Sequence, residues 1–149
     1  MAASPEQLHE LLKYCMDFGR TMLEDSGEFY PFGAVMGADG QLKAVGAYDG
    51  NEMPNPQDIY QLLSDALTAD LRAGNVVAIA LAANVNIPST YKSPSPDALR
   101  VQLETEDYSR LISVPYTLSK RGFFKKTTTA NYGEPIPVDV PPNSRTVLG

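Results

Sequence analysis

The chain has 149 residues, of which 43% are hydrophobic and 20% are charged, so its composition predicts one globular domain and fits neither a simply disordered chain nor a coiled coil. A single cysteine excludes a framework of internal disulfides, and together with a single histidine it excludes zinc sites built from cysteine and histidine. The formal net charge of −6 argues against binding to nucleic acid, because that affinity depends on a basic surface.

The first predicted element is a helix that begins at Pro5. Ser4 is suited to cap the helix N-terminus, and Gln7 completes a capping box with Ser4. Apolar side chains then recur at helical spacing as far as Leu23, and the pair Ser26-Gly27 is a stop signal. This continuous apolar stripe predicts that the helix packs on a large surface.

A strand hairpin and a second helix are predicted next. Residues 32–36 and 42–48 form the two strands of the hairpin, and Asp39-Gly40 is the turn signal between them. Small residues in both strands leave room for a helix to lie close to the hairpin. Asn55 is suited to cap the second helix, which runs to the stop signal at Gly74.

Three or four further strands are predicted after the second helix. The uninterrupted apolar run at 76–83 is typical of a central strand that is buried on both faces. Strict alternation at 99–104 predicts a half-buried strand. The next strand spans 111–118, where Pro115 requires an edge or a bulge because proline has no N–H to donate. Residues 123–129 predict a last strand whose lysines protect an edge.

Two proline-rich segments are predicted to lie outside the regular elements. Residues 88–97 form a surface loop, which is a candidate lid over a ligand. Residues 131–149 contain four prolines and are expected to form an extended tail, the alternatives being disorder or a position across a neighbouring subunit. The domain itself is predicted to span residues 1–130.

The element order predicts the α+β class. We expect a single antiparallel-dominated sheet of five to six strands with two helices packed on it, in the order α-β-β-α-β-β-β(-β). This order resembles that of profilin-like and roadblock-like domains. Residues 27–36 (GEFYPFGAVM), followed by Asp39-Gly40, also resemble the opening of a family of uncharacterised small bacterial proteins, with the motif E-F-Y-P-F-G-A-V. That resemblance implies a fold and no activity.

The sequence predicts no catalytic, cofactor-binding or metal-binding residue, because it holds no nucleophile–base set and no phosphate-binding loop. His9 lies off the apolar stripe of the first helix, which is typical of a surface histidine. Cys15 lies within the stripe and is expected in the core. Glu104, Glu106 and Asp107 surround one predicted turn and are expected to be solvated, although burial of one of them would suit acid–base chemistry.

Charge is distributed unevenly in this acidic chain. Residues 1–70 carry 3 basic and 12 acidic side chains, whereas residues 71–149 carry 9 basic and 6 acidic ones. Four of the cations fall within seven positions, beside two phenylalanines. Such a segment suits an acidic partner, and the alternative is an edge strand that its lysines protect. The candidate interaction residues are those of this segment and one aromatic residue elsewhere in the chain, Tyr30. The segment contributes Lys120, Arg121, Phe123, Phe124, Lys125 and Lys126.

These patterns predict a cytoplasmic, non-enzymatic protein–protein interaction domain that forms a homodimer or another homo-oligomer. We expect no cofactor, since the sequence holds no cofactor-binding motif. We also expect no membrane contact, because the N-terminus lacks a signal-peptide pattern and no apolar run would span a bilayer. The lone thiol suits a reducing compartment.

Two alternatives stay open. The first is a small-molecule-binding sensor or carrier, which an apolar pocket with convergent polar groups would favour. The second is a metal-independent enzyme that uses carboxylates, tyrosines and the backbone. A buried carboxylate with a raised pKa would favour that alternative.

Overall fold

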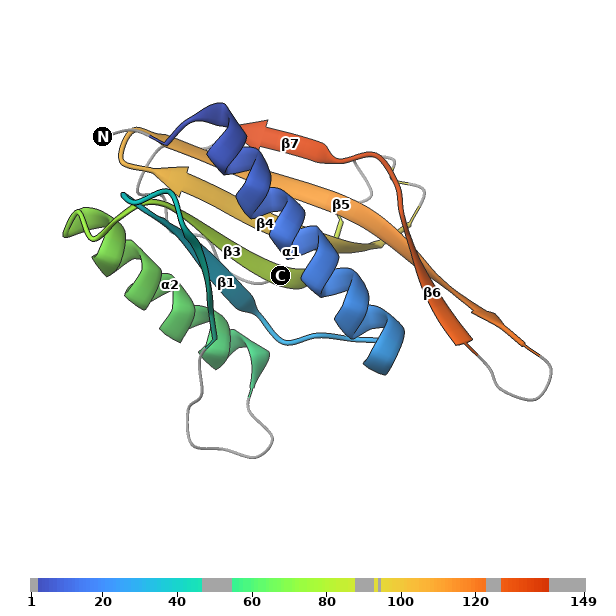
Figure 1. Cartoon of the computed structure of the whole chain (residues 1–149). Helices are drawn as coiled ribbons and strands as arrows, with labels where there is room; N and C mark the ends of the chain where they lie inside the picture. The colour runs from blue at the N-terminus through green and yellow to red at the C-terminus, as the bar shows by residue number, and fades with distance from the viewer. Residues whose placement is uncertain (1–2, 47–54, 88–92, 94, 123–126, 140–149) are drawn as a thin grey trace.

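The computed structural model describes residues 3–46, 55–87, 93, 95–122 and 127–139. Two helices and seven strands follow one another in this part of the chain (Figure 1). The elements are α1 (Pro5–Ser26), β1 (Phe32–Gly37), β2 (Leu42–Val45), α2 (Pro56–Arg72), β3 (Val76–Asn86), β4 (Asp97–Thr105), β5 (Tyr108–Arg121), β6 (Thr127–Tyr132) and β7 (Ile136–Asp139). The predicted α+β class is therefore confirmed, in the order α-β-β-α-β-β-β-β-β.

All seven strands belong to one sheet, in which every described pairing is antiparallel. The order across the sheet is β2-β1-β3-β4-β5-β6, and β7 pairs with β5. β3 therefore lies at the centre, as its uninterrupted apolar sequence predicted. Strands β6 and β7 pair with successive parts of β5, at Tyr116–Arg121 and Arg110–Ser113.

Pro115 lies between those two parts of β5. Its carbonyl accepts a hydrogen bond of 2.8 Å from the N–H of Gly133, which belongs to the connection between β6 and β7. The backbone N and carbonyl of a strand residue face the same neighbouring strand. The N of Pro115 therefore faces the connection between β6 and β7, where no strand residue requires an N–H donor from β5. This position satisfies the expectation that Pro115 needs an edge or an irregularity.

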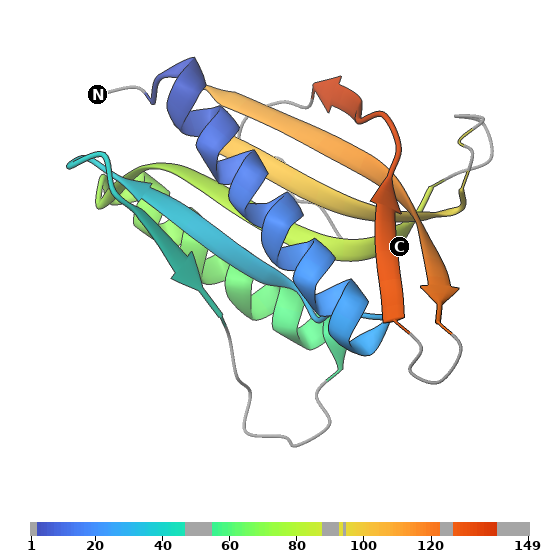
Figure 2. The same cartoon turned by 45° about the vertical axis from the view of Figure 1, so that its right-hand side comes forward.

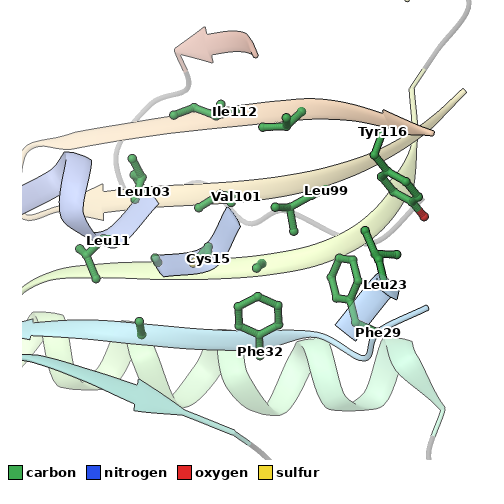
Figure 3. Packing of buried hydrophobic residues seen from close by; sticks show 14 of the residues in the cluster. Leu11, Cys15, Leu23, Phe29, Phe32, Leu99, Val101, Leu103, Ile112 and Tyr116 are labelled. Carbon is green, nitrogen blue, oxygen red and sulfur yellow. The ribbon is translucent and has the colours of Figure 1, made fainter. Parts of the chain in front are cut away.

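The two helices lie on opposite faces of the sheet, α1 on one and α2 on the other (Figure 2). Because successive strand side chains point to opposite faces, each strand contributes to two cores. Leu99 and Val101 of β4 pack with Leu11 and Cys15 of α1 (Figure 3). On the other face, Ile79 belongs to the core beneath α2.

Small residues allow the helices to approach the sheet closely. A Cβ at Gly33 of β1 would lie 2.9 Å from the carbonyl oxygen of Ala80 and 2.9 Å from Leu67 Cδ1 of α2. At Gly19 of α1, an added Cβ would lie 3.4 Å from Leu99. The expected close packing of a helix on the hairpin is therefore confirmed, and Gly33 is the residue that permits it.

The prediction that β4 is half-buried is wrong. Gln102 and Glu104 point away from the α1 core, yet only 6% and 3% of their surfaces are exposed. β4 lies between β3 and β5, and its residues from Val101 to Thr105 are buried on both faces although the sequence alternates. Glu104 is consequently not a solvated turn residue as expected, whereas Glu106 and Asp107 are exposed at the turn.

The sheet also continues beyond residue 130, which raises the strand count above the expected five to six. The predicted last strand at 123–129 is displaced, because β6 begins at Thr127 and residues 123–126 lie outside the described residues. Four residues of the expected tail form β7, and Asp139 accepts a 2.6 Å hydrogen bond from the Arg110 guanidinium. Proline is tolerated in β7 because this strand pairs with β5 alone among the described strands.

Three contacts fasten β6 to α1. The Tyr132 hydroxyl donates a 2.7 Å hydrogen bond to the carbonyl of Met16, and the N–H of Ala130 donates a 2.9 Å hydrogen bond to the Glu24 carboxylate. The Arg20 guanidinium lies 4.8 Å from the centre of the Tyr132 ring, as a cation over an aromatic face. These contacts hold β6 against α1. We call β6 and the part of β5 that pairs with it, residues 116–121, the β5–β6 arm.

Candidate functional site

The β5–β6 arm carries two of the predicted interaction residues. Lys120 and Arg121 are exposed near its outer end, and neither forms an ion pair with another described residue. Figure 1 shows this arm extending past the other strands, at the end of the molecule where α1 finishes and α2 starts. The other four residues of the basic-aromatic segment, Phe123, Phe124, Lys125 and Lys126, lie outside the described residues.

A groove of about 870 Å³ opens at the same end of the molecule. The C-terminal end of α1, the N-terminal end of α2 and the adjoining ends of β3, β4 and β5 enclose it, and we call it the end groove. Leu118 of the β5–β6 arm lines the groove with 39% of its surface exposed. Two exposed carboxylates, Glu28 and Asp97, also line it, and neither forms an ion pair within the described part of the chain.

Tyr30 lies beside the end groove. It lines an adjacent cavity of about 210 Å³ that shares Glu28, Pro56 and Asn84 with the groove, and 47% of its surface is exposed. The fold therefore brings Tyr30 to the end of the molecule that carries Leu118, although about ninety residues separate them in the sequence. Tyr30 therefore lies at the same end of the molecule as the strand that carries Lys120 and Arg121.

Polar contacts give the floor of the end groove a defined shape. The Tyr116 hydroxyl donates a 2.8 Å hydrogen bond to the amide oxygen of Asn84. Burial raises the pKa of Tyr116, and the nearby Asp97 carboxylate raises it further, so the phenol stays protonated at neutral pH. The Ser95 hydroxyl donates a 2.7 Å hydrogen bond to the carbonyl of Tyr116, which ties the described end of the predicted 88–97 loop to β5.

A third cavity, of about 400 Å³, lies between α2 and strands β3 and β4. Its apolar floor contains Leu67, Ile79 and Leu81. Polar groups converge on this floor from α2 and β4, and they are Ser64, Asp65, Thr68, Arg72, Gln102 and Glu104. Asp65, Gln102 and Glu104 each also interact with another part of the chain. We call this cavity the α2 trench.

Sequence reasoning missed several residues of both sites. Leu118 follows the apolar alternation of β5, and this pattern predicts an ordinary strand residue with no role in a site. Glu28 and Asp97 carried no signal of their own, because each becomes part of the groove only through contacts between distant elements. Within the described residues, no group of three or more histidine, cysteine, aspartate or glutamate side chains could hold a metal ion.

Neither described helix is both long and apolar enough to span a bilayer. No protein-family model matches the chain, and no curated protein or solved structure matches it either. The functional argument consequently rests on the geometry of the end groove, the β5–β6 arm and the α2 trench.

Proposed function

We propose that this protein is a non-enzymatic, cytoplasmic interaction domain, and that its contact surface is the end that carries the end groove and the β5–β6 arm. The observation that supports this proposal is that two exposed apolar side chains, Tyr30 and Leu118, line neighbouring hollows that share the exposed carboxylate Glu28. Protein interfaces have this anatomy, in which aromatic or aliphatic anchors lie inside a polar rim.

The positive charge on the β5–β6 arm favours a partner with an acidic surface. Lys120 and Arg121 are exposed and form no ion pair with the described residues, so a partner with an acidic surface gains favourable contacts there. Such contacts increase the association rate and depend on salt, because exposed charges are screened over about 10 Å at 0.1 M. The apolar anchors supply the affinity that salt does not remove.

Photo-crosslinking at single positions tests the proposed surface. We expect a benzophenone amino acid at position 30 or 118 to give one ultraviolet-dependent protein adduct in the producing cells, since both side chains lie in the proposed interface. Position 62 is the matched control, because Leu62 is a similarly exposed apolar residue on the outer side of α2. Gel electrophoresis and mass spectrometry detect the adducts. Their absence at 30 and 118, or equal yield at 62, would show that this end is not an interface.

Small-molecule binding is a second candidate function, and the α2 trench is the observation that favours it. Its volume of about 400 Å³ and its apolar floor with converging polar groups are typical of ligand sites. We expect the fluorescence of 8-anilinonaphthalene-1-sulfonate to rise on binding to the native protein, because the aromatic rings of the dye fit the apolar floor of the trench.

A matched pair of substitutions tests whether the dye occupies the trench. Ala69→Trp fills the trench and should abolish the signal, whereas Ala66→Trp adds the same side chain to an exposed position of α2 outside the trench lining. The dye is excited directly, so the added tryptophans do not contribute. Equal fluorescence in both variants would place the dye elsewhere and count against this second function.

A further inference from the structure

We infer that the partner at the proposed interface is a second copy of this chain, with the β5–β6 arm of each copy lying against the end groove of the other. Lys120 and Arg121 of one copy then face Glu28 and Asp97 of its partner, and the same contacts form in reverse. This inference rests on the proposed function and adds the identity of the partner and the pairing of the charges.

Charge complementarity on a single surface supports a second copy. The arm presents two cations and the end groove presents two carboxylates, and all four side chains are exposed. None of the four forms an ion pair within the described part of the chain. A surface that carries both signs in separate places is complementary to itself, as a contact between identical subunits requires.

The arm carries the backbones of its two cations past the groove of the same copy. Leu118 lines that groove, and Lys120 and Arg121 follow it by two and three residues along an extended strand. At about 3.3 Å per residue, their backbones lie about 7–10 Å further along the arm. Figure 2 shows the arm continuing away from the sheet at this end. Both cations are therefore placed where the groove of a neighbouring copy can meet them.

Both halves of the contact lie at one end of the molecule, and this favours a closed dimer. A two-fold axis at that end allows both arms to meet both grooves at once, which satisfies four charge pairs and leaves no arm unmatched. The same axis brings Tyr30 and Leu118 of the two copies towards the centre of the contact, inside the charged rim. A head-to-tail arrangement would instead leave one arm and one groove unused at the ends of an open chain.

Two charge-reversed variants test the inference. The arm variant carries Lys120→Glu and Arg121→Glu, and the groove variant carries Glu28→Lys and Asp97→Lys. We expect the parent to be dimeric at low salt and each variant alone to dimerise on the order of 100-fold more weakly, because four opposite-charge pairs become like-charge pairs. In a one-to-one mixture the dimer should return, since every arm again meets a groove of opposite charge. Sedimentation velocity measures the species.

Control variants separate the contact from net charge. Lys13→Glu with Lys43→Glu changes the net charge by −4, as the arm variant does, and Glu10→Lys with Glu106→Lys changes it by +4, as the groove variant does. All four residues are exposed and lie outside the end groove and the arm, so neither control should weaken dimerisation. Far-ultraviolet circular dichroism and thermal melting confirm that each variant folds. A monomeric parent, a groove variant that still dimerises or a mixture that stays monomeric would overturn the second-copy inference, and an open chain of many copies would overturn the two-fold arrangement.

Failure of this inference is distinguishable from failure of the proposed function. A crosslinked adduct at position 30 or 118 whose mass is not twice that of the chain, together with a monomeric parent, would overturn the second copy and retain the interface. No adduct at either position would overturn the interface itself. A crosslinked adduct of twice the chain mass, together with restored dimerisation in the mixture, would support both.

Discussion

Replacing Leu63 by alanine is expected to lower the free energy of unfolding by about 2–5 kcal/mol, as truncation of a buried leucine generally does. Leu63 lies on the inner side of α2 with 1% of its surface exposed, in the core that also contains Ile59, Leu67 and Ile79. The substitution removes apolar contacts and leaves a cavity that close-packed neighbours fill only in part. Urea unfolding at equilibrium measures the loss.

Leu62→Ala is the matched control, because Leu62 is the next residue of the same helix and 44% of its surface is exposed. Both substitutions change helix propensity equally, so their difference reports burial alone. We expect Leu62→Ala to change stability by no more than about 0.5 kcal/mol. Similar losses at the two positions would mean that α2 does not face the sheet through Leu63.

Native Cys15 is expected to react with a thiol reagent at least roughly 1000-fold more slowly than it does in the unfolded protein. Burial raises the pKa of Cys15 to about 12, because the α1 core disfavours the charged thiolate. The thiolate is the reacting form, and at pH 8 its fraction is roughly 1000-fold smaller than for an ordinary cysteine with a pKa of about 8.5. Restricted access of the reagent slows the reaction further.

The labelling time course is followed by mass spectrometry, with the protein in 8 M urea as the control that must label fully. Stability should also decline as pH rises through about 8.5, since the unfolded thiol ionises there and loses its proton while the folded thiol keeps it. The variant Cys15→Ala lacks this part of the pH dependence. Fast labelling of the folded protein would contradict the core position of Cys15.

Local signals in the sequence were sufficient for the elements themselves. The capping box at Ser4 and Gln7 is present as predicted, with a hydrogen bond from the N–H of Gln7 to the Ser4 hydroxyl. Asn55 caps α2 through a 2.8 Å hydrogen bond from the N–H of Gln57. Such caps depend on residues within one helical turn, so the sequence alone carries all the information that they need.

Strand environment was predicted less well, because it depends on neighbours that lie far away in the sequence. The unbroken apolar run of β3 predicted its central position in the sheet correctly. The sequence of β4 did not predict its burial, since Gln102 and Glu104 are polar and yet buried. Alternation indicates an exposed face only when nothing covers that face, and the packing of distant parts of the chain on the sheet determines what does.

The sequence by itself determined the class of the fold, the two amphipathic helices and the basic-aromatic segment with its candidate residues. The tertiary structure alone decided that the helices lie on opposite faces and that β7 continues the sheet. It also decided that Tyr30, Leu118, Glu28 and Asp97 share one end of the molecule. The physical reason is that capping and periodicity act over a few residues. A surface instead combines elements that are far apart in the sequence, and their separation along the chain does not predict their distance in space.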